Sequence, residues 1–505
     1  MTASSLLHRP APEAPDGPAL IRWLATAPGI RDRVVTDGRH AVSYAAAAPL
    51  LERLDDRFRR ASVTLHHPVA LECSQSVAGA LTLLHLLSRR YDVVLLPDLG
   101  ESSKESGVPR FVPSFCSHLV TASARPGAAS PEEEIGIGAN PGFAAEPAIS
   151  DFAGPDLYLR TSGSTGSPKL TRMSHQKWLN NALACVERWH LTADDRLSVP
   201  VPIFHSYGFG AAFLPGLLAG AAMDLGSGGN LLRYLEREQR FGPNVAFLTP
   251  ALCDMFLSVR KSPRPYRLAV TAGDKIKPET MAGFEPRFGP LLNLYGSAEM
   301  GAVSSAAPDD PAATRLATAG YPLAGIELRV EPTGEEIEIF PGEQAGRLQC
   351  RQRNGSAGYL IQEGRWRFEP RGDDEWFATG DLAKIRADGY VQILGRSGLS
   401  VKRDGLLVVF ADVETAVEKI AGVQRAILVA DGESRRGSRL VAVCLAVPAG
   451  ERPRPDAVRR RCLELLPRYA VPDAVVIVDR LPQLPSGKVD RRAVRDLIAS
   501  SPGSN

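Results

Sequence analysis

The chain has 505 residues, of which 44% are hydrophobic and 23% are charged, so it is long enough for two or more domains with substantial cores. The formal net charge of +2 gives no long-range attraction to nucleic acid or to an anionic membrane. The seven cysteines include no C-x-x-C pair, which argues against a zinc site or a disulfide framework and favours a reducing, cytoplasmic setting.

The first 150 residues show the alternation of strands and helices that is typical of a parallel α/β sheet. Helices are predicted over residues 41–60 and 78–87, and apolar strands over 69–71 and 93–96. In the first helix Leu50, Leu51, Leu54 and Phe58 share one face. Residues 121–150 are rich in Ala, Pro, Gly and Glu and predict a surface excursion. The first ten residues lack the basic and apolar segments of a signal peptide.

Residues 157–169 form a short apolar strand followed by a hydroxyl- and glycine-rich loop that ends on a lysine. Gly163 and Gly166 let the backbone amides turn toward an anion, and Lys169 adds a positive charge. The hydroxyl donors of the loop are Thr161, Ser162, Ser164, Thr165 and Ser167. This is not a Walker A loop, because Pro168 precedes the lysine and Leu170 follows it. The sequence therefore predicts a phosphate-binding loop of another kind.

The next segment predicts a helix over 174–189 and a strand over 196–199, and His205 follows just past the strand. Ligands of open α/β sheets gather beyond the carboxyl ends of strands, so His205 is placed to contact a substrate. Residues 206–223 form an uncharged stretch that Gly and Pro interrupt. Its length is marginal for a membrane span, and we expect a buried helix beside the active site.

Three more apolar strands are predicted at 245–249, 268–273 and 291–295, and each runs into Pro, Gly-Asp or Gly-Ser. Residues 320–394 show glycine spacing and alternating runs that predict antiparallel β-structure in a separate subdomain. The remaining residues predict a small α+β unit, with strands near 424–429, 440–447 and 474–478 and a helix over 457–466.

Seven motifs follow one another in the order that is known from the AMP-forming acid ligases, a superfamily of acyl-CoA and aryl-CoA synthetases, peptide-synthetase adenylation domains and luciferases. They lie at residues 161–169, 202–205, 295–299, 379–381, 395–396, 402–405 and 484–488. The resemblance implies an α/β fold with a large N-terminal domain of layered sheets and a β-subdomain at about 320–394. A small, mobile α+β C-terminal domain would follow, with the boundary between residues 395 and 396 and a hinge directly after Arg396.

The resemblance also implies roles for individual residues. Lys488 is expected to be catalytic, bridging the substrate carboxylate and the α-phosphate of ATP, with Lys169 on the pyrophosphate and His205 at the acid. Glu299 is expected to hold Mg²⁺, since this ion takes one or two carboxylates together with substrate phosphates. The residues expected to bind the nucleotide are Thr161, Ser162, Gly163, Ser164, Thr165, Gly166, Gly273, Asp274, Tyr295, Gly296, Ser297, Asp381 and Arg396. Among them Gly273 and Asp274 would lie against adenine, and Asp381 would take the ribose hydroxyls.

The implied reaction joins a carboxylic acid to AMP with release of pyrophosphate, and then transfers the acyl group to the thiol of CoA or of a phosphopantetheinyl carrier protein. We expect the acceptor to be a separate molecule. An amide-forming enzyme that passes acyl-AMP to an amine is the alternative. A nucleotide-binding pseudoenzyme is disfavoured, because Lys169 and Lys488 are both present.

Two positions depart from the family pattern. Ala298 replaces a residue whose hydroxyl normally contacts the AMP phosphate, which predicts slower activation. Gly398 replaces the usual Asp or Lys of the hinge, and its freer backbone would either ease domain rotation or leave the thioester-forming pose poorly defined. The chain also lacks the Phe-Asp pair that holds an α-amino group in peptide synthetases, since residues 203–208 read Ile-Phe-His-Ser-Tyr-Gly. This favours an acyl or aryl acid over an α-amino acid.

Overall fold

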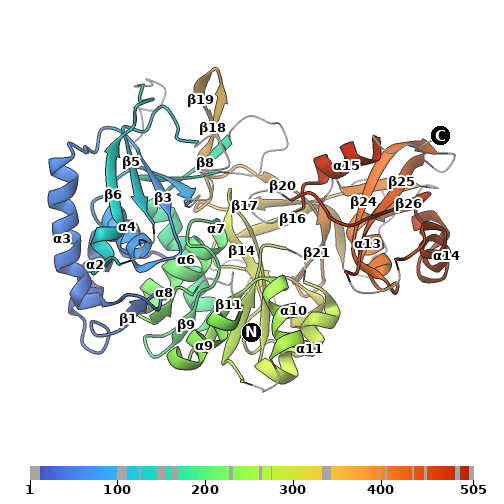
Figure 1. Cartoon of the computed structure of the whole chain (residues 1–505), viewed down its shortest axis with the longest axis horizontal. Helices are drawn as coiled ribbons and strands as arrows, with labels where there is room; N and C mark the ends of the chain where they lie inside the picture. The colour runs from blue at the N-terminus through green and yellow to red at the C-terminus, as the bar shows by residue number, and fades with distance from the viewer. Residues whose placement is uncertain are drawn as a thin grey trace. The chain divides into compact units, whose positions relative to one another are not determined.

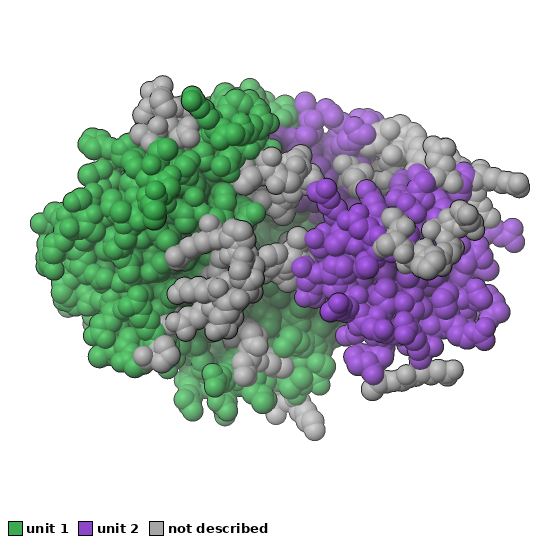
Figure 2. Space-filling view, turned by 45° about the horizontal axis from the view of Figure 1, so that its top comes forward, with its two compact units in different colours: residues 1–327, 350–376 green, residues 328–349, 377–505 purple. Residues whose placement is uncertain are grey.

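The computed structural model of the protein describes most of the chain, and every structural statement below concerns the residues that it describes. These are residues 12–98, 111–123, 125, 127–144, 155–160, 169–226, 231–260, 264–274, 276–332, 343–396, 399–403, 406–434, 437–448, 452–483 and 489–499. The chain divides into two compact units, coloured in Figure 2. Unit 1 comprises residues 1–327 and 350–376, and unit 2 comprises residues 328–349 and 377–505. The boundaries of these units differ from the predicted domain boundary between residues 395 and 396, which stays a prediction.

The first sheet of unit 1 contains eight strands within the described ranges. In spatial order these are β19 (Arg365–Pro370), β18 (Gly358–Glu363), β8 (Lys169–Ser174), β7 (Asp156–Arg160), β4 (Val93–Pro97), β3 (Val69–Cys73), β5 (His118–Ala122) and β6 (Ile135–Ala139). Strands β7, β4, β3 and β5 run parallel, while β8 and β6 pair antiparallel at the two ends of this group. All five side chains of β3 are buried, which agrees with the continuous apolar character that parallel strands need when both faces are covered.

The second sheet of unit 1 contains nine described strands. In spatial order these are β15 (Tyr321–Pro322), β14 (Gly301–Ser305), β13 (Leu291–Ser297), β12 (Leu268–Thr271), β11 (Val245–Leu248), β9 (Arg196–Ser198), β10 (Ala222–Asp224), β1 (Val34–Thr36) and β2 (Ala41–Ser43). Strands β13, β12, β11, β9, β10 and β1 are parallel to their neighbours within this run. Their carboxyl ends therefore lie along one edge of the sheet.

The helices of unit 1 cover these sheets. They are α2 (Gly17–Thr26), α3 (Tyr44–Arg60), α4 (Val77–Ser88), α6 (His175–Trp189), α7 (Ser206–Gly208), α8 (Leu214–Ala219), α9 (Leu231–Phe241), α10 (Pro250–Val259), α11 (Pro278–Phe288) and α12 (Ala312–Ala317), together with a 3₁₀ turn at Pro131–Glu134. Of these, α2, α3, α4, α6 and α10 each begin where a side chain caps the first turn. In α3, which lies beside α2 and α4 in Figure 1, Ser43 caps the helix by accepting a hydrogen bond from the amide of Ala46 at 3.2 Å. The helix buries Leu51, Leu54 and Phe58, as the sequence predicts.

Three sequence predictions for unit 1 need correction. Residues 41–43 form β2 rather than the start of a helix, because Ser43 caps α3 from outside. Residues 135–139, predicted as part of a surface excursion, form the edge strand β6 against β5. The stretch 206–223 is buried but does not form one helix: α7, a π-helix at Phe209–Phe213 and α8 follow one another before β10. No helix in the described part of the chain is long and apolar enough to cross a membrane.

The hairpin of β18 and β19 belongs to the first sheet and not to a separate β-subdomain. Strand β18 pairs antiparallel with β8, and the hairpin extends the sheet beyond it in Figure 1. This pairing satisfies the backbone groups that β8 would otherwise expose at the edge. Part of the predicted β-subdomain is therefore an addition to the N-terminal sheet, which the glycine spacing and alternation of residues 320–394 did not reveal.

Unit 2 contains antiparallel β-structure and an α+β portion. The described strands of its first sheet are β16 (Glu327–Glu331), β17 (Gln344–Arg351), β20 (Phe377–Ile385) and β21 (Val391–Arg396), and its second sheet contains β23 (Leu406–Val409), β22 (Ser400–Arg403), β25 (Gly437–Ala446), β24 (Val423–Ser434) and β26 (Ala474–Val478). The helices are α13 (Phe410–Glu418), α14 (Pro455–Leu465) and α15 (Arg491–Ala499). Alternate residues of β24 face opposite ways: Leu428 packs with α13 and α14 residues, whereas Ile427 packs with Val494 of α15.

Candidate active site

The predicted site residues of the second sheet follow strands that are neighbours and parallel. His205 comes after β9, Gly273 and Asp274 come after β12, and Tyr295 lies near the end of β13. Because β9, β11, β12 and β13 are adjacent in the sheet, their carboxyl ends present these residues along one edge. This is the edge at which open α/β sheets bind ligands.

The loop that carries His205 is held by Gln75, which lies between β3 of the first sheet and α4. The side-chain amide of Gln75 donates to the Val199 carbonyl at 2.6 Å, and its oxygen accepts from the Ile203 amide at 2.8 Å. The hydroxyl of Tyr207 donates to the Val270 carbonyl at 2.8 Å, near the carboxyl end of β12. His205 itself is exposed. The loop thus lies over the strand ends, with its histidine accessible to a ligand.

Gly273 and Asp274 are both exposed just past β12. Gly273 has a φ of +92°, a conformation that favours glycine. Among the described residues, leaving aside the two chain neighbours of Gly273, no heavy atom lies within 4 Å of the place where a Cβ of residue 273 would stand. The glycine is therefore required by the backbone conformation, and it leaves open space at the position predicted to face adenine.

The turn from Tyr295 to Glu299 is constrained by close backbone packing. The pairing of β13 with β14 shifts register between Tyr295 and Gly296. A Cβ at Gly296 would stand 2.3 Å from the Gly301 carbonyl oxygen, so only glycine fits there. The Ser297 hydroxyl accepts a hydrogen bond from the Met300 amide at 3.2 Å. The predicted nucleotide and metal residues are thus carried on a tightly built turn.

Two buried amide side chains support this turn from outside. Asn181 of α6 is 2% exposed and bonds both backbone groups of Ala302, accepting from its amide at 2.9 Å and donating to its carbonyl at 2.8 Å. Gln352 donates to the carbonyl of Met300. Both residues were missed by the sequence reasoning, because an isolated Asn or Gln carries no local signal of such a role.

The structure brings Lys169 and Glu299 together through Tyr359. The Nζ atom of Lys169 lies 3.4 Å from the centroid of the Tyr359 ring. The hydroxyl of Tyr359 donates a hydrogen bond to Oε1 of Glu299 at 3.1 Å. Burial, followed by the negative charge of Glu299, raises the pKa of Tyr359 above its usual value. Tyr359 was not among the predicted site residues.

The surroundings of Glu299 suit a Mg²⁺ ion that substrate phosphates share. Its side chain is half-buried, and the hydrogen bond from Tyr359 engages one of its two oxygens. Within the described ranges, no three His, Cys, Asp or Glu side chains gather in a way that could hold a metal ion without help from a substrate. A single carboxylate supplemented by phosphate oxygens is a usual arrangement for Mg²⁺, so the residues present fit the ion.

The two predicted ribose and phosphate residues of unit 2 lie opposite each other on β20 and β21. The Nε atom of Arg396 is 3.0 Å from Oδ1 of Asp381, and the Arg396 side chain also donates to the Thr379 carbonyl at 3.1 Å. Asp381 is 6% exposed, whereas the Arg396 side chain is 59% exposed. Gly380, within β20 between Thr379 and Asp381, has a φ of +76°, a conformation that favours glycine. The pair is thus assembled within one unit.

Several predicted residues lie outside the described part of the chain. They are Lys488, Gly398 and the loop residues Thr161, Ser162, Gly163, Ser164, Thr165 and Gly166. Strand β7 ends at Arg160 and β8 begins at Lys169, on either side of the predicted phosphate loop. The roles assigned to these residues stay predictions.

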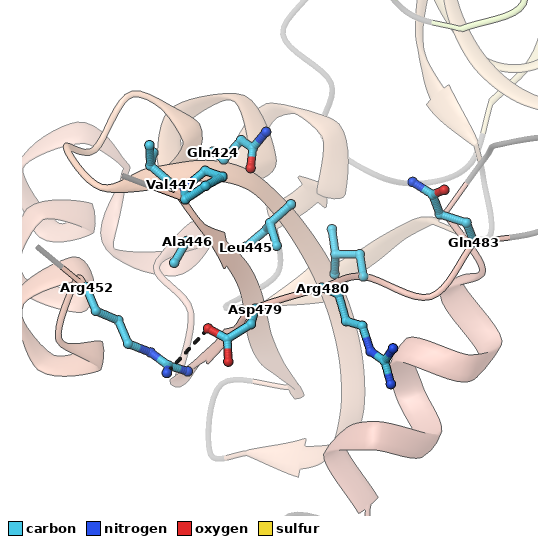
Figure 3. Close-up of a pocket in the computed structure, with 10 residues that line it drawn as sticks. Gln424, Leu445, Ala446, Val447, Arg452, Asp479, Arg480 and Gln483 are labelled. Carbon is cyan, nitrogen blue, oxygen red and sulfur yellow. Dashed lines mark ion pairs between the residues drawn. The ribbon is translucent and has the colours of Figure 1, made fainter. Parts of the chain in front are cut away.

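A cavity of about 600 Å³ opens in unit 2, where the end of β25 meets the chain after β26 (Figure 3). Leu445 and Val447 supply apolar surface, and Arg452 forms an ion pair with Asp479 at 3.4 Å. None of the predicted site residues is among the described residues that line it. Asp381 and Arg396, the described site residues of unit 2, therefore do not line this cavity.

Comparison with known proteins assigns the family. The AMP-binding enzyme family matches residues 140–360, and the AMP-binding enzyme C-terminal domain matches residues 412–488. The chain therefore belongs to the superfamily of AMP-forming acid ligases, as its motifs predict.

Individual relatives agree with this assignment. Salicylyl-CoA synthase / salicylate adenylyltransferase of a Streptomyces species is 27% identical over 359 residues, which cover 68% of this chain and 63% of that protein. The mitochondrial medium-chain acyl-CoA ligase of Rattus norvegicus is 27% identical over 359 residues, which cover 66% of this chain and 56% of the ligase. The chain thus spans about three fifths of the length of these relatives.

Solved structures share the fold of the chain. The ATP-bound crystal structure of MatB from Rhodopseudomonas palustris matches 96% of this chain and 99% of that chain, with a TM-score of 0.76 and 20% sequence identity. The predicted fold class, a large N-terminal part with layered α/β sheets and a smaller C-terminal α+β part, is confirmed.

Proposed function

We propose that the protein activates a carboxylic acid with ATP, forming acyl-AMP and releasing pyrophosphate, and then transfers the acyl group to the thiol of CoA or of a free-standing carrier protein. The observation that carries this proposal is that Lys169 and Glu299 both contact Tyr359. A cation for phosphate and a carboxylate for Mg²⁺ then lie on either side of one side chain. Family membership supports the same reaction type.

The chemical problem is that two anions must meet. The substrate carboxylate is already ionised, so no general base is required, but its approach to the α-phosphate is opposed by charge. One cation about 4 Å away contributes about 4 kcal/mol at an effective dielectric constant near 20, or about three decades of rate if it acts mainly in the transition state. We assign this role to Lys488, and we assign Lys169 with the loop at 161–168 to the leaving pyrophosphate.

The remaining described residues would bind and orient ATP. Glu299 would hold Mg²⁺, which neutralises phosphate charge when bound. Asp381 would accept hydrogen bonds from the ribose hydroxyls, and the exposed guanidinium of Arg396 would reach ribose or phosphate. Gly273 and Asp274 would border adenine, with Tyr295 against its ring and Gly296 and Ser297 in the adjoining turn.

An acyl or aryl acid without an α-ammonium group is the proposed substrate class. Residues 199–223, which contain His205 and the buried α7–α8 segment, include no Asp, Glu, Lys or Arg. An α-ammonium group would find no carboxylate on this segment. The relatives named for salicylate and for medium-chain acids are consistent with such a substrate.

Acid-dependent exchange of pyrophosphate into ATP, measured over a panel of fatty, aryl and α-amino acids, tests the first half-reaction. We expect exchange with members of the first two classes. Exchange with α-amino acids alone would contradict the proposed substrate class, and binding of ATP without exchange for any acid would favour the pseudoenzyme alternative.

The second half-reaction is tested by offering CoA, a phosphopantetheinyl carrier protein and an amine to the enzyme with its preferred acid. Formation of a thioester is expected. If acyl-AMP accumulates with both thiols and the amine is acylated, the amide-forming alternative replaces the thiol ligase.

A further inference from the structure

We propose that Tyr359 is a positioning residue for the activation step: its hydroxyl orients Glu299 and its ring orients Lys169. This inference rests on the proposed function, since it assigns those two residues to Mg²⁺ and to phosphate. Neither the motifs nor the family match assigns a role to Tyr359.

The first part of the argument is the double attachment of Glu299 to one short segment. The Ser356 amide donates to the Glu299 carbonyl at 2.7 Å, and the Tyr359 hydroxyl donates to its carboxylate at 3.1 Å. The backbone and the side chain of Glu299 therefore both accept hydrogen bonds from the segment 356–359. A carboxylate oriented in this way keeps its second oxygen available to a cation, without a search among rotamers.

The second part concerns Lys169, the first residue of β8. In the pairing of β8 with β18, Lys169 lies opposite Ile361 and Thr171 lies opposite Tyr359. Lys169 and Tyr359 are thus diagonal neighbours, a relation that long and aromatic side chains can span. The ammonium lies over the ring at 3.4 Å from its centroid. A cation over an aromatic face is attracted to it, so the ring limits the freedom of a flexible lysine beside the predicted phosphate loop.

The third part is the rigidity of Tyr359 itself. Gly358 has a φ of +139°, and a Cβ there would stand 2.0 Å from the Glu369 carbonyl oxygen. The guanidinium of Arg371 donates to the Ser356 carbonyl at 2.6 Å and 3.0 Å. The Ala357 amide donates to the Arg172 carbonyl at 2.7 Å. The segment before Tyr359 is therefore held from several sides, as a positioning residue requires.

The test is the binding of ATP, measured by isothermal titration calorimetry without acid, once with Mg²⁺ and once with EDTA. Tyr359→Phe keeps the ring and removes only the hydroxyl. It should lower the ratio of the affinity with Mg²⁺ to that with EDTA about threefold to tenfold, and leave the affinity in EDTA unchanged. Adding Tyr359→Phe to Glu299→Gln should lower the ratio no further, because the hydroxyl acts through Glu299.

Tyr359→Leu removes the ring as well. Compared with Tyr359→Phe, it should lower the affinity for ATP in EDTA by about threefold to tenfold, because Lys169 loses its support. Tyr44→Phe is the matched control: it also removes a hydroxyl hydrogen bond in unit 1, from Tyr44 to the Ala221 carbonyl at 2.6 Å, and neither residue is among those assigned to ATP or Mg²⁺. It should change neither affinity.

The proposal is overturned if Tyr359→Phe leaves the ratio of ATP affinity with Mg²⁺ to that with EDTA unchanged. It is also overturned if Tyr359→Leu binds ATP in EDTA as tightly as Tyr359→Phe, or more tightly. A further loss in the double variant with Glu299→Gln also overturns it. Failure of the proposed function has a different signature, because the wild-type protein would then show no acid-dependent exchange of pyrophosphate into ATP, whatever ratios the Tyr359 variants give.

Discussion

Arg396 and Asp381 face each other across β21 and β20, with Nε of the arginine 3.0 Å from Oδ1 of the aspartate. The carboxylate that is predicted to take the ribose hydroxyls is therefore already oriented by a charged partner. Such preorganisation supports binding in the ground state as well as in the transition state, whereas metal charge matters most as the phosphate reorganises.

Asp381→Ala and Glu299→Ala should consequently affect different steps: the first should affect ATP binding and the second chiefly the rate of reaction. Asp381→Ala should weaken ATP binding about tenfold or more, with or without Mg²⁺, because hydrogen bonds to a charged group are lost. Glu299→Ala should leave metal-free ATP binding unchanged, lower ATP affinity in Mg²⁺ at least as much as Tyr359→Phe does, and chiefly lower the rate of pyrophosphate exchange at saturating ATP. Calorimetry with EDTA and exchange kinetics with Mg²⁺ measure the two effects. Equal effects of both substitutions on ATP affinity, without a difference in rate, would contradict these roles.

Gln75→Leu should impair recognition of the acid rather than of ATP. Its side chain bonds Val199 and Ile203 on either side of the turn that precedes His205. Loss of both bonds loosens that loop, so we expect KM for the acid to rise about tenfold while KM for ATP stays unchanged. Gln75→Glu, which keeps the acceptor for Ile203 and loses the donor to Val199, should give a smaller rise. A parallel rise in both KM values would show that Gln75 only stabilises the fold.

Lys488→Ala should separate the two half-reactions. The lysine is predicted to neutralise charge only while the carboxylate attacks ATP, so its loss should lower acid-dependent pyrophosphate exchange by about two to three decades. Transfer of the acyl group from chemically supplied acyl-AMP to a thiol should remain nearly intact. Gly398→Pro, which restricts the predicted hinge, should impair thiol transfer and spare exchange. Equal loss of both half-reactions in Lys488→Ala would refute the two-pose mechanism.

The raised pKa of Asp92 predicts that the stability of the protein depends on pH. Burial raises its pKa to about 7 from a usual 3.8, although the hydrogen bond from the Asp156 amide and the charge of Arg172 oppose the shift. Between about pH 4 and pH 7 the folded protein thus binds more protons at Asp92 than the unfolded chain does. The free energy of unfolding should fall as the pH rises through this window, by at most about 1.4 kcal/mol per pH unit from this group.

Asp92→Asn removes this titration and retains a side-chain oxygen that can accept from the Asp156 amide. The Tm of the variant relative to the wild type should therefore increase between pH 4.5 and pH 7.5, when both are followed by circular dichroism across that range. A difference in Tm that does not change with pH would contradict the assignment of this proton to Asp92.

Much of the local structure could be predicted from the sequence. Strand β26 occupies the predicted residues 474–478, and α3 buries three of its four predicted apolar residues. Strand β6 was missed because the glycine-rich sequence Ile-Gly-Ile-Gly-Ala is also typical of a loop, and it becomes a strand by pairing with β5. The hairpin of β18 and β19 was included in a separate β-subdomain, because its partner β8 in the first sheet is distant in the sequence.

The sequence by itself determined the family, because its motifs stand in the order of the AMP-forming acid ligases. The residue types in those motifs nominated Lys169, Glu299, Asp381 and Arg396, since phosphate, Mg²⁺ and ribose each demand particular groups. Only the tertiary structure decided which side chains hold those groups. Tyr359, Gln75 and Asn181 act through contacts between segments far apart in the chain. A tyrosine or an amide has the same local signal wherever it stands, and its partner is set by strand pairing and helix packing that no short stretch of sequence contains.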